Sequence, residues 1–410
     1  MPHHSCRFCG GALSIGLVDL GETPLANSYL ANADDIAKEK SFPLNVKVCE
    51  SCYLAQVEEA VDASAIFNHD YAYLSSYSSS WVAHAKSYAD AMTERFQLNT
   101  DSLVMEVASN DGYLLQHFLN KNMSVLGVEP AGHAAQVAQS KGIDTHIDFF
   151  NQATAKALKE EGLQADLIAA NNVVAHVPQI GDFVAGFQHV LKAEGVLTFE
   201  FPHLLNMINF VQFDTIYHEH YSYISLIALE RILNAGNLRA FDVEKLSTHG
   251  GSLRVFCCHQ EAEYSETEAL RSVRQTEIDA KLNSPQGYAG YTQVVETVRD
   301  GLVAFLDKAD KDGKTVAAYG AAAKGNTFLN YAKITKDRIS FVVDRSKEKQ
   351  DTLLPGSHIP VLDPAQLKER KPDYILILPW NLKDEISKEH SYIKDWGGQF
   401  VIAVPQITIF

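Results

Sequence analysis

The residues Ser102-Leu-Val-Met-Glu-Val-Ala-Ser-Asn-Asp-Gly112 set the fold class of this chain. Positions 102–107 are mostly apolar and predict a buried strand, which Asn110-Asp111-Gly112 ends in a turn. Tyr113 to Leu119 predicts the start of a helix, and Ser124 to Val128 predicts a second strand that leads into Glu129. This spacing is that of a β-α-β unit, so we expect an α/β fold with parallel strands.

The same unit indicates which ligand it binds. An acidic residue at the end of the second strand, here Glu129, accepts hydrogen bonds from ribose hydroxyls in folds of this plan. The G-x-G-x-x-G fingerprint of dinucleotide-binding folds is absent, and Ala108 and Ser109 stand in its place. Their small side chains still permit close approach to the backbone. Without a pyrophosphate cradle, the pattern favours S-adenosylmethionine over NAD.

The α/β alternation continues along the chain. Ala165 to Ala170 predicts a third strand, residues 186–191 a helix and residues 195–201 a further strand. The carboxyl ends of such strands face the ligand crevice, which places His176 and His203 near it. A lone histidine there is usually structural, and we retain His176 as the functional candidate.

Tyr217-His-Glu-His-Tyr-Ser-Tyr223 is unusually rich in polar aromatic side chains. A buried core does not tolerate so many polar groups without partners, and a solvated loop does not need so many rings. Ser225 is a candidate cap for a helix from Leu226 to Leu233, ended by Gly236. The stretch therefore lies between a strand and a helix near the crevice. The alternative is a polar surface strand.

Composition limits the class of protein. A chain of 410 residues predicts two or three domains. The net charge of −16 argues against nucleic acid as a partner. No apolar run is long enough to span a membrane, and the N-terminus lacks the pattern of a secretory signal, so we expect a cytoplasmic protein. The sequence leaves the oligomeric state open, and a monomer is compatible with it.

Four of the six cysteines form two Cys-x-x-Cys pairs, Cys6 with Cys9 and Cys49 with Cys52. Four thiolates suit tetrahedral zinc better than they suit disulfides in a chain without an export signal. A complete set of four cysteine ligands leaves no open coordination position. We therefore expect a structural zinc site rather than a catalytic one. The segment around residues 19–27 shows turn residues and little periodicity.

The C-terminal third predicts a second α/β unit. Ser265-Glu-Thr-Glu268 is a candidate capping box before helices over 266–282 and 291–308. Strands are expected over 314–319, 339–343 and 374–378. Small residues and Lys324 follow the first of these strands, before a helix, which is the arrangement of an anion seat. We expect Lys324 to bind phosphate, with a closely packed β-α turn as the alternative.

Taken together, the motifs resemble those of the nucleotide-sugar C-methyltransferases that make branched deoxysugars. The resemblance spans nearly the whole chain. Its motifs, in order, are the two cysteine pairs, Glu106–Gly112, Gly127–Ala131, Asn172–His176, Tyr217–Tyr223, His249–Arg254 and Tyr319–Asn326.

The resemblance implies a zinc domain over 1–70, an S-adenosylmethionine domain over 71–245 and a C-terminal sugar-nucleotide domain over 246–410. The implied cofactor contacts are Glu106, Ala108, Ser109, Asn110, Gly112, Glu129, Pro130 and Asn172. The implied substrate contacts are His249, Arg254, Lys324 and Asn326. Arg254 meets either a phosphate or a protein carboxylate. The implied substrate is a 4-keto-deoxysugar, linked to dTDP or alternatively GDP, that is methylated at C-3.

A mechanism follows from that substrate. A base removes the C-3 proton, charge moves to the C-4 oxygen, and the enolate attacks the methyl group of S-adenosylmethionine. His220 is our candidate base because imidazole titrates near neutral pH, and His176 is its rival. Glu219 would orient a partner, and Tyr217 and Tyr71 would donate hydrogen bonds to the oxyanion.

Two other functions remain open at this point: a nicotinamide-dependent nucleotide-sugar oxidoreductase and a zinc-containing RNA-modification module. The missing glycine fingerprint argues against the first. The acidic net charge argues against the second.

Overall fold

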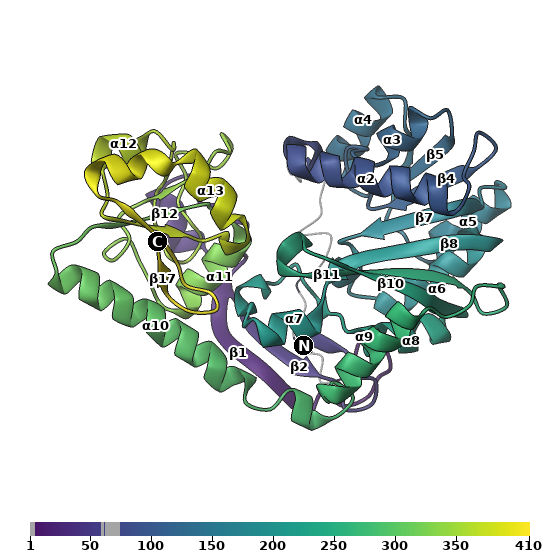
Figure 1. Ribbon diagram of the computed structural model, residues 1–410, viewed down its shortest axis with the longest axis horizontal. Coiled ribbons are helices and arrows are strands. Elements are labelled where there is room, and N and C mark those ends of the chain that lie inside the picture. The colour runs from purple at the N-terminus through teal and green to yellow at the C-terminus, as the bar shows by residue number, and fades with distance from the viewer. Residues whose placement is uncertain (1–4, 59–60, 62–73) are drawn as a thin grey trace.

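The computed structural model describes residues 5–58, 61 and 74–410, and it builds them around three β-sheets (Figure 1). Two lobes stand side by side in this view, and the N-terminal strands lie beneath and between them. The expected α/β fold class is confirmed.

The largest sheet has seven strands and forms the right-hand lobe of Figure 1. Its spatial order is β10 (Leu238–Leu246), β11 (Ser252–His259), β8 (Leu191–Pro202), β7 (Ala165–Asn171), β4 (Leu103–Val107), β5 (Ser124–Val128) and β6 (Asp144–His146). The strands from β8 to β6 pair in parallel, and β11 pairs antiparallel with both β8 and β10. The strand order reverses between β4 and β7, which is where open α/β sheets bind ligands.

Helices cover both faces of this sheet because buried strand residues alternate in direction. Val104 packs on one side, beneath the first three helices, and Met105 packs on the other side. The first side carries α2 (Ser79–Arg95), α3 (Leu115–Leu119) and α4 (Gly132–Ser140). The second carries α5 (Gln152–Glu160), α6 (Ile180–Val190), α8 (Leu226–Ala235) and α9 (Glu268–Asp279).

The N-terminal sheet differs from the sequence expectation. Its order is β1 (Ile15–Pro24), β2 (Ser41–Val48), β3 (Ala55–Val57) and β9 (Ser222–Tyr223). β1 runs through most of residues 19–27, whose turn residues and low periodicity did not indicate a strand. Two register shifts in the β1–β2 ladder interrupt the alternation, which hides the strand from periodicity. β9 brings the Tyr217–Tyr223 stretch into this sheet.

The third sheet forms the left-hand lobe of Figure 1. Its order is β14 (Val361–Leu362), β13 (Val342–Val343), β12 (Val316–Tyr319), β15 (Tyr374–Ile377), β16 (Gln399–Ile402) and β17 (Thr408–Ile409). The helices of this part are α10 (Tyr291–Lys311), α11 (Ala323–Tyr331), α12 (Gln366–Arg370) and α13 (Lys383–Glu389). All pairings except β16–β17 are parallel, as expected for a second Rossmann-like unit.

Short elements connect these parts. They are α7 (Leu204–Asn209) and the 3-10 helices η1 (Ala33–Lys38), η2 (Ser75–Tyr77), η3 (Val174–His176), η4 (Phe213–Thr215), η5 (Thr248–Gly250), η6 (Pro285–Gly287), η7 (Trp380–Leu382) and η8 (Ser391–Trp396). The residues of the candidate site lie on or beside four of these elements, η3, η4, η5 and η7.

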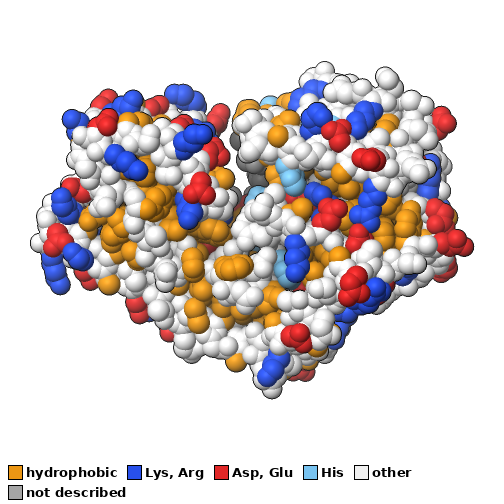
Figure 2. All heavy atoms as spheres, viewed as in Figure 1, with side chains coloured by type: hydrophobic (Ala, Val, Ile, Leu, Met, Phe, Trp, Pro, Cys, Tyr) orange, Lys and Arg blue, Asp and Glu red, His pale blue; other side chains and the backbone are white. Residues whose placement is uncertain are grey.

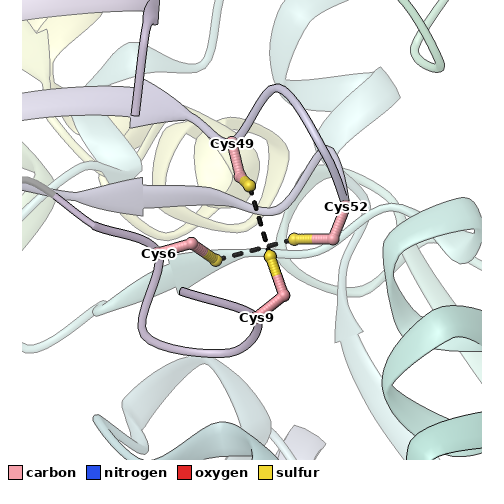
Figure 3. Close-up of side chains that lie close together, drawn as sticks. All are labelled: Cys6, Cys9, Cys49 and Cys52. Carbon is pink, nitrogen blue, oxygen red and sulfur yellow. Dashed lines mark hydrogen bonds between the residues drawn. The ribbon is translucent and has the colours of Figure 1, made fainter. Parts of the chain in front are cut away.

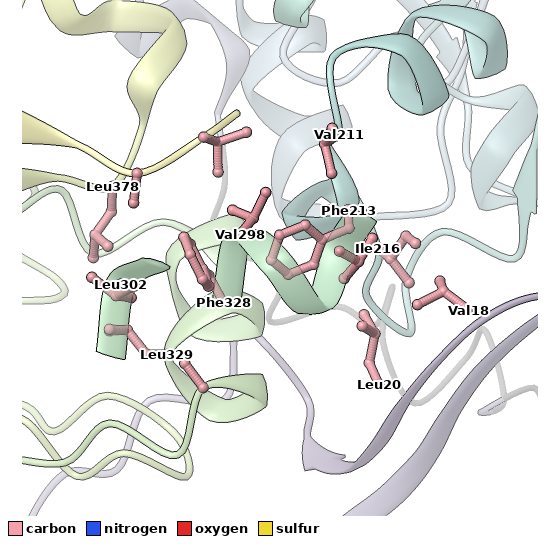
Figure 4. Packing of buried hydrophobic residues seen from close by; sticks show 14 of the residues in the cluster. Val18, Leu20, Val211, Phe213, Ile216, Val298, Leu302, Phe328, Leu329 and Leu378 are labelled. Carbon is pink, nitrogen blue, oxygen red and sulfur yellow. The ribbon is translucent and has the colours of Figure 1, made fainter. Parts of the chain in front are cut away.

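One apolar cluster joins the N-terminal sheet, the C-terminal sheet and the segment that follows β8. It unites β1, η4, α10 and α11, and the rings of Phe213 and Phe328 lie 5.1 Å apart within it. Figure 4 shows Val18, Leu20, Val211, Phe213, Ile216, Val298, Leu302, Phe328, Leu329 and Leu378 converging there. The cluster fastens η4, just before the Tyr217–Tyr223 stretch, to a helix of the C-terminal lobe.

Several element ends differ from the predictions. The capping box at Ser265 is wrong, because Thr267 caps α9 by accepting from the Leu270 amide at 3.2 Å. α6 starts at Ile180 rather than at 186, and β8 starts at Leu191. The cap at Ser225 is confirmed, since its hydroxyl accepts from the Ala228 amide at 3.1 Å. Local patterns locate an element more reliably than its ends.

Two further observations concern the chain as a whole. β11 lies beyond residue 245, so a domain boundary there separates β10 from its antiparallel partner. No helix within the described ranges is both long enough and apolar enough to cross a bilayer.

Candidate active site

The four paired cysteines converge on one point (Figure 3). Their Sγ atoms all lie within 4.8 Å of one another, and the Cys6–Cys52 and Cys9–Cys49 pairs are 3.6 and 3.5 Å apart. Tetrahedral zinc with bonds of about 2.3 Å requires sulfur separations near these values. Gly11 is needed beside them, because an added Cβ would lie 3.1 Å from the Cys49 sulfur. The residues therefore fit a zinc ion.

The loop between Cys6 and Cys9 also contacts the Tyr217–Tyr223 stretch. The Arg7 guanidinium donates to the Val57 carbonyl at 2.6 Å and to the carbonyl of Tyr221. The Gln56 amide donates to the Cys6 sulfur at 3.1 Å, one strand away from β9. The metal site thereby supports the backbone on which His220 lies.

The loop after β4 is a cradle at the switch point of the large sheet. Ala108 and Asn110 have φ values of 59° and 48°, and Gly112 has 75°. A Cβ at Gly112 would lie 2.3 Å from the Ile143 side chain, so only glycine fits. Ser109 packs its side chain where a Cβ on Gly127 would be.

Two acidic side chains border this cradle. The Glu129 carboxylate accepts from the backbone amides of Asn110 at 2.9 Å and Ala131 at 2.8 Å, and Pro130 lies between the strand end and α4. Burial raises the pKa of Glu129. Glu106 is fully buried, and burial raises its pKa well above the usual range. Neither of its oxygens meets the geometric criteria for a hydrogen bond in the described part of the chain, and the nearby Tyr113 side chain acts to lower its pKa.

An unpartnered buried carboxyl group at a strand end is where an amino or hydroxyl group of a ligand would be accepted. The cradle thus fits S-adenosylmethionine. Asn172 follows β7 directly and has a φ of 52°.

The Tyr217–Tyr223 stretch is a turn that leads into the buried strand β9, not a polar surface strand. The His220 ring packs on Tyr217 at 4.0 Å and on His176 at 4.7 Å between centroids. His220 lines a small cavity together with Gln212, Thr215 and Tyr223.

The orientation of both imidazoles is defined by backbone carbonyls. His220 Nδ1 lies 2.8 Å from the Thr215 oxygen, and His176 Nδ1 lies 2.9 Å from the Glu219 oxygen. A carbonyl only accepts, so the ring proton of each neutral histidine is on Nδ1 and Nε2 is the basic nitrogen. Burial lowers the pKa of His176 to about 4 and that of His220 well below its usual range.

The neighbouring residues of the stretch face elsewhere. His218 Nε2 lies 3.2 Å from the Pro43 oxygen, on the side of the N-terminal sheet. The buried Glu219 carboxylate accepts from the Asn27 amide at 2.6 Å, and burial raises its pKa. Tyr71 lies outside the described residues.

The C-terminal lobe contributes the opposite wall. Lys324 donates to Asn381 at 2.8 Å, and its ammonium lies 4.7 Å from the centre of the Trp380 ring. The Trp380 indole donates to Asp214 of η4 at 2.7 Å. Burial lowers the pKa of Lys324 and raises that of Asp214 to about 6. Figure 2 shows the notch between the lobes, with histidine atoms beside it.

The expected anion seat is smaller than its sequence suggested. The amide of Gly320 donates to the Val343 carbonyl at 2.8 Å, and that of Ala321 donates to Asp344 at 2.7 Å. α11 already begins at Ala323, so an anion would meet the first turn of α11 and Lys324. Gly325 packs against Leu378.

Two predicted substrate contacts lie in protein interactions. Arg254 is buried between Glu200 at 2.7 Å and Glu244 at 2.9 Å. The Asn326 amide is buried and donates to the Ala26 carbonyl at 2.7 Å. Contact with substrate would require either side chain to leave these partners, and both roles stay predictions. His249 lies at the notch, with its Nε2 3.5 Å from the Asn172 amide nitrogen.

Sequence reasoning missed Asp214, Trp380, His84 and Glu200 as parts of this region. None of the four lies in a recognisable motif together with its partner. The one signal was for Glu200, an acidic residue near the end of a predicted strand, and it is fully buried.

Comparisons with known proteins identify the chain. Family models match residues 6–67 (putative zinc binding domain), 81–242 (methyltransferase domain) and 247–405 (C-methyltransferase C-terminal domain). C-methyltransferase NovU from Streptomyces niveus is 33% identical over 405 residues, which cover 99% of this chain and 96% of that protein. The chain belongs to the C-methyltransferase family. It is an S-adenosylmethionine-dependent methyltransferase with a zinc-binding N-terminal domain.

Solved structures are similar over less than half of this C-methyltransferase. Magnesium protoporphyrin IX methyltransferase from Synechocystis PCC 6803 covers 44% of this chain and 83% of its own, at 13% identity and a TM-score of 0.36. A methyltransferase from Anabaena variabilis covers 44% of this chain and 87% of its own, at 13% identity and a TM-score of 0.36. Membership of the C-methyltransferase family replaces the oxidoreductase and RNA-modification alternatives.

Proposed function

We propose that this C-methyltransferase methylates C-3 of a nucleotide-linked 4-keto-deoxysugar, with dTDP as the nucleotide and GDP as the alternative. The observation that carries the proposal is the orientation of His220 at the cavity. Its Nδ1 is committed to the Thr215 carbonyl, so Nε2 is a neutral base at a small cavity that Ala175 and Tyr223 also line. A base of this kind is what a carbon acid next to a ketone requires.

In the proposed reaction His220 Nε2 takes the C-3 proton, and the electron pair of the C–H bond forms an enolate on the C-4 oxygen. Bound S-adenosylmethionine supplies an electrophilic methyl group. Tyr217, which packs on His220, donates a hydrogen bond to the developing oxyanion, and Tyr71 is the second proposed donor. The oxyanion charge is thereby stabilised as the proton leaves.

The other residues of the stretch have supporting roles in this proposal. Glu219 accepts from Asn27 through its side chain and from His176 through its carbonyl, so it orients the rival base. His176 is the alternative base, since its Nδ1 is held in the same way.

Lys324 is proposed to meet the diphosphate of the sugar nucleotide. It is the lysine beside the Trp380 ring at the edge of the notch, and its charge is felt at both His220 and His249. An ammonium this close to the base disfavours its protonated form, which keeps the base neutral before substrate binds.

We also propose the domain division 1–70, 71–245 and 246–410.

Incubation with S-adenosylmethionine and a panel of 4-keto nucleotide sugars tests the proposal. We expect a mass gain of one methyl group, assigned to C-3 by NMR, with a dTDP-linked sugar. Methylation at another carbon, or of none of the sugars, would contradict it.

His220→Asn tests the base. We expect turnover to fall by about 10²- to 10⁴-fold, together with exchange of the C-3 proton into D2O. His218→Asn is the matched control, because its side chain contacts the Phe42–Pro43 backbone instead. Undiminished exchange in His220→Asn would transfer the role to His176.

A further inference from the structure

Glu200, near the end of β8, is a fully buried carboxylate that holds three separate elements. It accepts from His84 of α2 at 3.0 Å, from Arg254 of β11 at 2.7 Å and from the Thr248 hydroxyl of η5 at 3.2 Å. Burial opposes its charge, but the His84 hydrogen bond and the Arg254 charge hold its pKa below the usual range. Glu200 is therefore an anion at neutral pH.

The same residue holds two strained backbone positions. Its carbonyl accepts from the Asn172 amide at 2.7 Å, and Asn172 has a φ of 52°. Its carboxylate holds Thr248, which begins the turn in which His249 has φ 52° and ψ 24°. A left-handed conformation costs a residue with a side chain about 1 kcal/mol or more and persists only where its surroundings enforce it.

These two strained residues meet at the notch. His249 Nε2 lies 3.5 Å from the Asn172 amide nitrogen, which can only donate. The ring proton of His249 is then on Nδ1, which has no protein partner within the described ranges. The edge of the ring meets Trp81, which stacks on His84 at 4.9 Å.

His249 is also close to the proposed chemistry. Its charge would be felt at His176 and His220, and Lys324 across the notch acts on it in turn. Burial and Lys324 lower its pKa to about 4, so the imidazole is a neutral donor at pH 7.

We propose that Glu200 is a positioning residue for methyl transfer: through Thr248 it fixes the turn that presents the His249 Nδ1–H to an oxygen of the acceptor sugar. The identity of that acceptor rests on the proposed function. Glu200 itself touches neither substrate, and its effect passes through Thr248 and His249.

Two variants and a control test this proposal. Thr248→Val removes only the hydroxyl, and His249→Gly removes the imidazole where glycine accepts the left-handed turn. We expect each to lower kcat/KM for the sugar by about tenfold and to leave KM for S-adenosylmethionine within twofold. Glu244→Gln is the control, since it loses the second Arg254 ion pair without contact to η5. It should retain wild-type kinetics.

The double variant decides whether Thr248 acts through His249. We expect Thr248→Val to have no further effect on kcat/KM in the His249→Gly background. A full additional loss there, or wild-type kinetics in either single variant, would overturn the proposal.

A spectroscopic measurement of the His249 tautomer does not depend on the substrate. Imidazole ¹⁵N shifts, assigned by their loss in His249→Gly, should show the Nδ1–H tautomer in the wild type and a mixture in Thr248→Val. An unchanged tautomer in Thr248→Val would overturn the proposal. Failure to methylate any sugar in the panel would instead refute the proposed function, while this measurement still reports on Glu200 and His249.

Discussion

At the residue scale, the notch is defined by three imidazoles whose charged forms are disfavoured. Burial lowers the pKa of His176 and His249 to about 4 and that of His220 well below its usual range. His176 and His220 interact with each other, and Lys324 adds a positive charge opposite them. A base in this setting is deprotonated before substrate arrives.

The pH dependence of catalysis should show that the pKa of the histidine base is lowered. A histidine base loses activity when pH falls through its folded-state pKa, and this pKa is lowered. We therefore expect the acidic limb of kcat/KM for the sugar to lie below about pH 6.5, the ordinary histidine value. A pH profile at saturating S-adenosylmethionine measures it, and a limb centred at or above 6.5 would contradict a lowered pKa for the base.

At the scale of elements, α9 fixes the start of α8, directly after the Tyr217–Tyr223 stretch. The Glu277 carboxylate, fully buried, accepts from the Leu226 amide at 2.7 Å and the Ile227 amide at 2.8 Å. It also pairs with His203 at 2.7 Å. An anion at a helix N-terminus is favourable, and burial strengthens the effect.

Glu277→Gln should lower the free energy of unfolding by about 2–4 kcal/mol. The amide nitrogen cannot accept, so one buried donor at the start of α8 loses its partner. Chemical denaturation measures the change. Glu268→Gln in the same helix is the control, because its carboxylate is exposed and pairs with Arg271. Equal loss in both variants would refute a specific role for Glu277.

The four-cysteine zinc site is a second element that supports the Tyr217–Tyr223 stretch. The sheet it supports includes β9, which belongs to the Tyr217–Tyr223 stretch. Cys9 is the exposed ligand, so Cys9→Ser disturbs packing least. We expect loss of bound zinc, a melting temperature lower by roughly 5 °C or more, and reduced turnover. Metal analysis and thermal melts of wild-type, chelated and zinc-reloaded protein check this, and full activity in zinc-free protein would contradict it.

At the scale of the whole molecule, the candidate site lies beside hydrogen bonds that join the C-terminal lobe to the segment around η4. The Trp380–Asp214 hydrogen bond is one of them, and a Cβ on Gly250 would lie 2.6 Å from the Trp380 ring. The C-terminal lobe therefore rests directly on the η4 and η5 turns.

Trp380→Phe should raise KM for the sugar about fivefold and leave KM for S-adenosylmethionine unchanged. The aromatic ring is kept, while the hydrogen bond that sets the spacing of the lobes is lost. Trp396→Phe is the matched control, because its indole donates to Pro372 within the C-terminal lobe. A similar rise in both variants, or a rise in the KM for the methyl donor, would argue against a role at the notch.

Features encoded by neighbouring residues could be predicted from the sequence. The β-α-β unit around Ser102–Gly112, the paired cysteines and the Ser225 cap follow from patterns a few residues long, where residue type and local geometry are directly linked. The motifs were also sufficient to suggest the C-methyltransferase family.

Only the tertiary structure decides which partner each side chain contacts. His220 and His218 are chemically identical and two residues apart, yet one meets Thr215 and the cavity while the other meets the distant Pro43. Likewise, the Ala321 amide looks free for an anion until Asp344 is seen to accept it. Hydrogen bonds are directional and partners across a fold are far apart in sequence, so only the folded chain shows which are made.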